Sequence, residues 1–341
     1  MQNDNSRPLR PPWFRSRRAY GTRMTDADFW RPYVEMVCRR HGLTCNEVRP
    51  GLPGTHVVFI VDERYAVKLY THWFGWAEDY LVERTLYAAI TQTPELPAPA
   101  MVASGELYSE SNAWSWPYNI TSVVPGVSAG EAHPRMSDED RVAIARFLGP
   151  VLRRVHGLTV DGPERLRRSW EPFNRFVAGQ RRACAARHRR RGLLPDTWVA
   201  QMDRYLPSVM ELVTREGRPC LLHGDMTADH VLGEFQDGSW LPTGIIDFGN
   251  ARSGDPLYEL IALHLDLFRG DKRLLRVFLE SYGMEIDAPD AFVRRAMSYT
   301  LLHEFDDLGT LLRAFPALHK IDDLEEMAVV LWDPRAPGFT L

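Results

Sequence analysis

The stretch HGDMTADHVLGEFQDGSWLPTGIIDFGN, residues 223–250, decides the fold. It opens with a His-x-Asp loop, continues as a strand, turns at Asp-Gly, and returns as a second strand. Such a hairpin brings Asp247 back beside Asp225. Two carboxylates held this close repel each other unless a cation or a proton lies between them. The stretch therefore predicts a magnesium site, since magnesium binds oxygen ligands and phosphates.

His230 is the unusual residue of this stretch, because it is the fifth residue after Asp225. In protein kinases an asparagine that binds metal occupies the corresponding place. Neutral imidazole is a poorer magnesium ligand than an amide oxygen and suits softer metals. The residues alone leave several roles open for His230: direct metal binding, binding through water, a hydrogen bond to a phosphate, or a structural role.

A lysine, Lys68, lies inside the predicted strand AVKLY. A lysine among apolar neighbours needs a counter-charge or an anionic ligand. Glu83, in the predicted helix that follows, is the expected counter-charge, and Glu78 is the substitute. An edge-strand lysine that reaches water is the alternative. Ahead of Lys68, the loop with Gly51 and Gly54 could approach phosphates by its backbone, although a plain turn explains it equally well.

Composition indicates an ordinary globular protein of 341 residues, with 45% hydrophobic and 25% charged residues. The four cysteines lack CxxC spacing, which favours free thiols in a reducing compartment. No apolar run approaches the roughly 18 residues of a membrane helix. We therefore expect a cytoplasmic, monomeric protein without membrane association.

Changes in amino-acid composition and hydrophobic pattern along the chain predict three segments. Residues 1–24 carry six arginines and one aspartate, and predict a flexible basic arm. Contact of this arm with nucleic acid is the less favoured alternative. Residues 25–126 predict a small lobe of antiparallel strands, and residues 127–341 predict a larger, mainly helical lobe. The expected fold class is α+β.

These motifs resemble the aminoglycoside phosphotransferase family, whose fold is similar to that of protein kinases. HGDMTADH resembles its catalytic loop, GIIDFGNARSGDPLYEL its metal loop, and AVKLY its phosphate-binding strand. The resemblance implies a bilobal kinase-like fold. Within the family, the segments AVKLYTHWFG, AWSWPY, LHLDLFRGDKRLL, LLHEFDDL and LEEMAVVLWDP look most similar to actinomycete hygromycin B phosphotransferases.

The resemblance also implies roles for individual residues. Asp225 would orient and deprotonate the acceptor hydroxyl. Asp247 and His230 would hold magnesium against the phosphates. Lys68, steadied by Glu83, would bind the α- and β-phosphates of ATP. The family's 2″-type enzymes are similar in placing histidine where His230 lies, so the resemblance implies an active enzyme with a variant metal site.

Ser122 and Val124 correspond to the linker whose backbone meets the nucleotide base in this family. Thr121 and Ser122 are polar where the family usually has bulky residues. The choice between ATP and GTP therefore stays open.

The acceptor is predicted from carboxylates in the C-terminal lobe. Aminoglycosides are polycations, and Asp266, Glu304 and Asp307 are the expected partners of their amines. Positions 304 and 307 would share one helix face, although a solvated acidic face is the alternative. Six arginines in QRRACAARHRRR, residues 180–191, would repel a polycation unless they form a solvated helix face.

Three functions from different classes follow from the sequence. The leading one is an ATP- and magnesium-dependent phosphotransferase that acts on a hydroxyl of hygromycin B or a related antibiotic. The second is a kinase of another sugar-containing antibiotic or of a small metabolite in the same fold, with an acceptor that is less basic or even anionic. The third is a kinase-like binding module without turnover, which the presence of Lys68, Asp225 and Asp247 disfavours.

Overall fold

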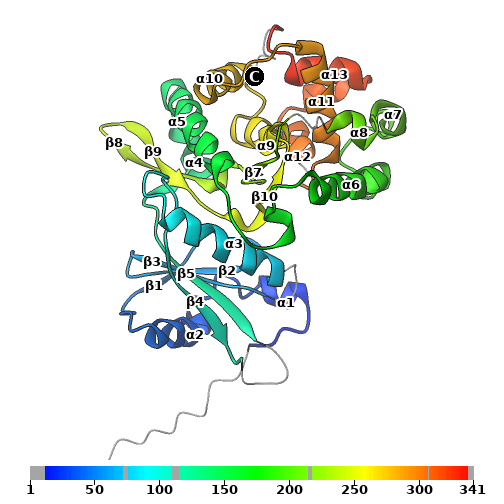
Figure 1. The fold of residues 1–341 in the computed structure, drawn as a ribbon. Coiled ribbons are helices and arrows are strands. Elements are labelled where there is room, and N and C mark those ends of the chain that lie inside the picture. The colour runs from blue at the N-terminus through cyan, green and yellow to red at the C-terminus, as the bar shows by residue number, and fades with distance from the viewer. Residues whose placement is uncertain (1–11, 72–75, 110–114, 214–216, 306, 337–341) are drawn as a thin grey trace, which may run out of the picture. The chain divides into compact units, whose positions relative to one another are not determined.

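The computed structural model describes residues 12–71, 76–109, 115–213, 217–305 and 307–336 (Figure 1). The chain divides into two compact units, Met1–Val124 and Pro125–Leu341, called unit 1 and unit 2 here. Unit 1 is built around an antiparallel sheet, and unit 2 is mainly helical. The predicted α+β class, with a small antiparallel sheet followed by a larger helical part, is confirmed.

In the described part of unit 1, five antiparallel strands form a sheet in the order β1-β2-β3-β5-β4. Its elements are α1 (Arg17–Gly21), α2 (Ala27–Arg40), β1 (Val48–Pro50), β2 (Val57–Val61), β3 (Tyr65–Leu69), α3 (Trp76–Thr91), β4 (Met101–Leu107) and β5 (Trp116–Ser122). The turn between β2 and β3 has positive φ at Asp62 and Glu63, as its Asp-Glu-Arg sequence suggests. Alternation places Phe59, Val67 and Ile120 in the core.

The segment before α2 differs from the expected flexible arm. Residues 1–11 lie outside the described residues, whereas Arg17–Gly21 forms α1 with Ser16 as its N-cap. Phe14 and Tyr20 are buried in the core of unit 1. The composition of this segment reflects its exposed arginines and does not reveal the apolar face that these aromatic side chains form.

Unit 2 begins with short elements and then becomes largely helical. Its elements are β6 (Val127–Ser128), α4 (Ala129–Ala132), η1 (His133–Arg135), α5 (Asp138–Gly157), η2 (Glu164–Leu166), α6 (Trp170–Arg191), α7 (Asp196–Tyr205), α8 (Val209–Leu212), β7 (Cys220–Leu222), η3 (Ala228–His230), β8 (Val231–Gln236), β9 (Ser239–Ile245), η4 (Phe248–Asn250), β10 (Arg252–Gly254), α9 (Pro256–Ala262), the π-helix η5 (Leu263–Leu267), α10 (Lys272–Tyr282), α11 (Pro289–Leu302), α12 (Asp307–Ala314), η6 (Pro316–Lys320) and α13 (Leu324–Trp332).

Two small antiparallel sheets of unit 2 position the catalytic stretch. The predicted hairpin is present as β8 and β9, and its turn has positive φ at Asp237 and Gly238. β7, immediately before the His-x-Asp loop, pairs with β10, which follows the second aspartate. The segments on either side of Asp225 and Asp247 are therefore fixed by paired strands rather than by flexible loops.

Helices pack around these strands. α5 packs against α10, β7 and β9, while α6 packs against β10 and α11. α9 lies next to α11 and contacts β7, so it lies directly behind the strand that leads into the loop (Figure 1). A capping box begins α5, with Ser137 and Asp140 bonded to each other's backbone N–H groups.

Candidate functional site

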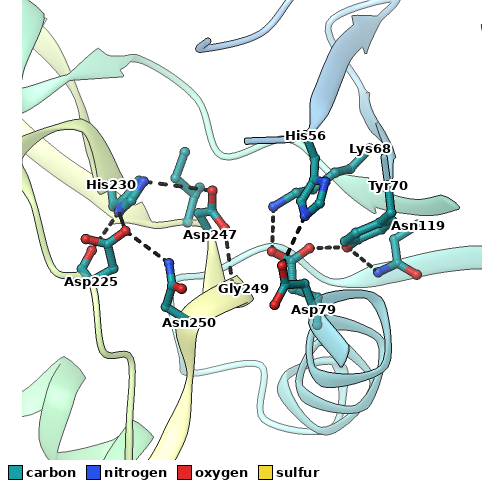
Figure 2. Close-up of polar contacts among 12 residues, drawn as sticks. His56, Lys68, Tyr70, Asp79, Asn119, Asp225, His230, Asp247, Gly249 and Asn250 are labelled. Carbon is teal, nitrogen blue, oxygen red and sulfur yellow. Dashed lines mark hydrogen bonds and ion pairs between the residues drawn. The ribbon is translucent and has the colours of Figure 1, made fainter. Parts of the chain in front are cut away.

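Lys68 lies near the end of β3 (Figure 2). Glu83 of α3 is its partner. The Lys68 Nζ lies 2.6 Å from the Glu83 Oε1, and Glu83 is fully buried. The Tyr70 hydroxyl donates to the other oxygen of Glu83, and the Asn119 amide donates to the Tyr70 hydroxyl at 2.7 Å. Glu83 is thus held on both oxygens, while Glu78 on the same helix is exposed.

His56 is a residue of unit 1 that the sequence reasoning missed. Its Nδ1 accepts the Thr71 backbone N–H at 3.2 Å, so the proton of the neutral ring lies on Nε2. That nitrogen lies 3.2 Å from a carboxylate oxygen of Asp79 (Figure 2). His56 therefore fixes the end of the loop before β2 to the end of β3 and to α3.

The linker residues Ser122 and Val124 lie at the end of unit 1. The Ser122 N–H donates to the Ala100 carbonyl, and the Ser122 Oγ accepts the Ala100 N–H, both at 2.9 Å. The side chain of Ser122 is therefore engaged with the segment before β4. Val124 is buried. A role of this backbone in binding the nucleotide base stays a prediction.

In unit 2, the loop from His223 to Asp225 makes a tight turn. Gly224 has φ of +81°, and a Cβ there would lie 2.7 Å from the Asn250 carbonyl oxygen. Only glycine tolerates both conditions. His223 is fully buried, and burial lowers its pKa to about 4. Its neutral ring accepts the Asp225 N–H at Nδ1 and donates from Nε2 to the Ile246 carbonyl, which joins the loop to the returning strand.

Asp225 and Asp247 are brought together by the hairpin, with His230 between them (Figure 2). A carboxylate oxygen of Asp225 lies 3.8 Å from His230 Nδ1, and one of Asp247 lies 3.8 Å from His230 Nε2. The Asn250 amide donates to Asp225 at 3.2 Å. Burial raises the pKa of Asp225 to about 6, and Asp247 adds to this effect while His230 opposes it. The Asp225 carboxylate is therefore suited to accept a proton near neutral pH.

The hydrogen bonds of His230 define which nitrogen faces Asp247. His230 Nδ1 lies 2.6 Å from the Asp225 backbone carbonyl, which can only accept, so Nδ1 carries the proton. The lone pair of the neutral ring then lies on Nε2, on the side of Asp247. A histidine that binds a metal commonly donates its other N–H to a backbone carbonyl in this way.

The donor set fits magnesium. Within the described residues, no group of three or more His, Cys, Asp or Glu side chains is arranged to hold a metal. Magnesium commonly binds one or two carboxylates and completes its shell with phosphates and water. The side chain of Asp247 is 36% exposed, compared with 15% for Asp225, so an ion can reach it.

Glu259 of α9 holds the backbone of the loop that leads to Asp225 and was missed by the sequence reasoning. Its carboxylate accepts the N–H of His223 at 2.6 Å and that of Gly224 at 3.1 Å. His156 Nε2 lies 3.3 Å from it, and His156 Nδ1 is bonded to the Tyr282 hydroxyl at 2.7 Å. Both residues immediately before Asp225 therefore depend on one buried carboxylate.

Glu259 should make stability depend on pH. Burial, the largest influence, raises the pKa of Glu259, but bonds and charges of His156 and His223 together hold that pKa below its ordinary value. A lowered folded-state pKa stabilises the protein above the unfolded pKa of about 4.3, and this stabilisation is lost as pH falls through the folded pKa. We expect the unfolding free energies of wild type and Glu259→Gln, measured in urea, to converge on acidification below about pH 4. A difference that stays constant with pH would contradict this.

The three predicted acceptor carboxylates have different surroundings. Asp266, in η5, accepts the Ala228 backbone N–H at 2.8 Å and so supports the catalytic loop. Glu304 forms an ion pair with Arg252 at 2.6 Å. Asp307, buried, lies 2.7 Å from His303 Nδ1. The single helix expected for positions 304 and 307 is wrong: α11 ends at Leu302, His303 has extended backbone, and Glu304 lies in a bend before α12.

The arginine run in α6 is only partly solvated. Arg182, Arg189 and Arg190 are exposed, whereas Arg187 is buried and donates to the Leu301 carbonyl at 3.0 Å. Arg191 donates to the Glu304 carbonyl at 2.9 Å. One face of the run therefore fixes the chain that leaves α11.

Residues 51–297 match the model of the phosphotransferase enzyme family. The chain belongs to this family. The match covers both the Lys68–Glu83 pair and the Asp225–Asp247 hairpin, so the predicted class, a phosphotransferase with a hydroxyl group as acceptor, is confirmed. The described residues contain no helix long and apolar enough to cross a membrane.

Solved structures of the same fold support the assignment. The GDP complex of aminoglycoside 2'-phosphotransferase-IIIa is 20% identical, with a TM-score of 0.57, covering 88% of this chain and 96% of that chain. A mutant of aminoglycoside phosphotransferase APH(4)-Ia, with ADP and hygromycin B bound, is 18% identical, with a TM-score of 0.52, covering 89% and 98%. At these identities the likeness shows the kinase-like fold.

A curated relative is much longer. Lysine-specific demethylase JMJ21 of Arabidopsis thaliana is 27% identical over an alignment of 269 residues, and the match covers 64% of this chain. The chain spans 28% of the length of that protein. The demethylation in its name is a property of the longer protein.

Proposed function

We propose that the protein is an ATP- and magnesium-dependent O-phosphotransferase that acts on a hydroxyl of an aminoglycoside antibiotic, with hygromycin B as the first acceptor to test. The observation that carries the proposal is the group formed by Asp225, Asn250, His230 and Asp247. It combines a carboxylate of raised pKa with a second, accessible carboxylate and an imidazole nitrogen.

In the proposed reaction, Asp225 accepts the proton of the acceptor hydroxyl. The hydroxyl oxygen bonds to the γ-phosphorus, the bond from this phosphorus to the β-phosphate oxygen breaks, and ADP leaves. Asn250 orients Asp225 by its hydrogen bond. Asp247 and His230 would hold magnesium, which neutralises phosphate charge. Lys68, fixed by Glu83, would bind the α- and β-phosphates.

The electrostatics around Asp225 support a cationic acceptor. Asp307 raises the pKa of Asp225, after the larger effect of burial. Burial likewise raises the pKa of Asp266, and Asp307 and Asp229 add to it. A positively charged amine close to these carboxylates would relieve their mutual repulsion. We choose hygromycin B among such acceptors because several sequence segments resemble those of hygromycin B phosphotransferases. A similar solved structure holds hygromycin B with ADP.

A metabolite kinase is the second candidate, and one observation favours it. Glu304 is paired with Arg252, and Asp266 is bonded to the catalytic loop, so both already have partners within the protein. Fewer carboxylates would then remain for a polycation. A sugar or amino alcohol with one or no amine would suit such a site.

The deciding experiment supplies ATP or GTP with magnesium and a panel of acceptors headed by hygromycin B. Nucleoside diphosphate release and the mass of each product are measured. Gain of one phosphoryl group by an aminoglycoside supports the proposal. No phosphorylation of any aminoglycoside, together with phosphorylation of a sugar or amino alcohol, would favour the second candidate instead.

Replacing His230 by asparagine should preserve turnover and change the metal preference. An amide oxygen is a harder ligand than imidazole, so we expect the ratio of manganese- to magnesium-supported activity to fall. Activity is measured with each metal in turn. His319→Asn, on an exposed residue of η6, is the matched control. A metal ratio that is the same in His230→Asn and wild type would remove His230 from the metal site.

A further inference from the structure

The segment ahead of α2 is an integral part of unit 1. The Phe14 ring lies 5.4 Å from the Tyr20 ring and 6.0 Å from the Trp30 ring. The Trp30 indole donates to the Arg23 carbonyl at 2.7 Å, and the Trp30 ring lies 5.3 Å from that of Trp116 in β5. This aromatic cluster anchors the segment containing α1 against the sheet (Figure 1).

Tyr20 connects this segment to the loop between β1 and β2. Its side chain is 1% exposed, and its hydroxyl donates to the Thr55 carbonyl at 3.1 Å. Thr55 itself is exposed, as are the residues from Leu52 to Gly54. The loop is fixed at its start by the Gly51 N–H, which donates to the Val58 carbonyl at 2.8 Å. Tyr20 therefore holds the far end of an otherwise exposed loop.

The strand that follows this loop pairs with the strand that carries Lys68. Burial raises the pKa of Tyr20 above its ordinary range, and the Lys68 ammonium and a hydrogen bond with Thr71 oppose this rise. Val58 of β2, the strand that follows the loop, pairs directly with Lys68 of β3. His56, next to Thr55, is bonded to the Thr71 N–H. Tyr20, the loop and the phosphate-binding lysine thus form one local arrangement.

We propose that Tyr20 is a positioning residue of the nucleotide site, which holds the Gly51–Thr55 loop beside Lys68 so that loop amides can bind the phosphates of a nucleoside triphosphate. Backbone N–H groups of a glycine-containing loop bind phosphate well when the loop is fixed in advance. The inference rests on the proposed function only for the role of Lys68 as a phosphate ligand. It gives residues 12–23 a function, so a chain that started at Met24 would bind nucleotide more weakly.

The test measures the affinity of Tyr20→Phe for ATP with magnesium by calorimetry, without an acceptor. Phenylalanine keeps the buried ring and removes one hydrogen bond, so we expect roughly three- to tenfold weaker binding. The KM for ATP should rise by a similar factor while kcat changes little. Amide hydrogen exchange at Gly54 and Thr55 should become faster. Tyr33→Phe, which removes a hydroxyl from the same aromatic cluster, is the matched control.

Each outcome separates the two proposals. Lys68→Ala should weaken nucleotide binding, which would show that the binding measurement responds to changes at the proposed nucleotide site of unit 1. Affinity of Tyr20→Phe within twofold of wild type, or a loss equal to that of Tyr33→Phe, would overturn the positioning role. Nucleotide binding that depends on Tyr20, together with silence on every aminoglycoside, would support this inference and overturn only the proposed acceptor.

Discussion

Asp225→Asn is expected to lower kcat by about 10²- to 10⁴-fold, the usual contribution of a general base. Asparagine keeps the size of the side chain and can still meet Asn250 after rotation, but it cannot accept the proton of the acceptor hydroxyl. Nucleotide affinity should stay close to that of wild type, since Lys68 and Glu83 belong to unit 1. Single-turnover phosphoryl transfer and calorimetric ATP binding measure the two quantities separately.

Asp229→Asn is the matched control for this prediction. Asp229 is an exposed carboxylate of the same loop, four residues after Asp225, and lies 3.4 Å from the Ser128 hydroxyl. The control removes a negative charge from the loop without touching the proposed base, so its kcat should stay within a few-fold of wild type. A comparable loss in both variants would mean that loop charge, rather than proton transfer, limits the reaction.

Glu259→Ala is expected to lower the free energy of unfolding by about 3–5 kcal/mol, the range for breaking a buried charged network. The substitution leaves the N–H groups of His223 and Gly224 and the Nε2 of His156 without their acceptor. Each unsatisfied buried group costs about 1–3 kcal/mol. Urea unfolding gives the stability. The kcat should fall as well, because Asp225 loses the turn that holds it.

A matched surface substitution distinguishes the loss of the buried Glu259 network from a general loss of negative charge. Glu280→Ala, on the exposed face of α10, should change stability by no more than about 0.5 kcal/mol. The free energy of unfolding of Glu259→Gln should lie between those of Glu259→Ala and Glu280→Ala. Its amide oxygen can accept one backbone N–H, whereas its NH₂ group is a donor and cannot bond to the other N–H. Stability of Glu259→Ala within 1 kcal/mol of wild type would show that the loop keeps its turn without this carboxylate.

The residues that could be predicted from sequence are those with a local pattern. Asp225 and Asp247 are joined by strand, turn and strand, and this pattern alone placed them together. Lys68 and Glu83 were predicted because a lysine within an apolar strand needs a buried partner. In each case the deciding interaction lies within one supersecondary unit.

The residues that could not be predicted act over long sequence separations. Glu259 meets the catalytic loop through backbone N–H groups 36 and 35 positions earlier, and backbone groups leave no trace in side-chain patterns. Asn250 lies three residues after Asp247, yet its contact with Asp225 depends on the fold of the hairpin. The ion pair between Arg252 and Glu304 fixes the bend between α11 and α12, which helical periodicity alone could not reveal.

The spacing of Glu259 and Asp266 has a consequence for engineering this protein. One continuous helical segment, α9 with the π-helix η5, supplies a carboxylate to each end of the catalytic loop. Asp266 supports the loop at Ala228 and Glu259 supports it at His223 and Gly224, so moving the segment moves both ends together. A graft of the catalytic loop into another scaffold must therefore carry residues 256–267 with it.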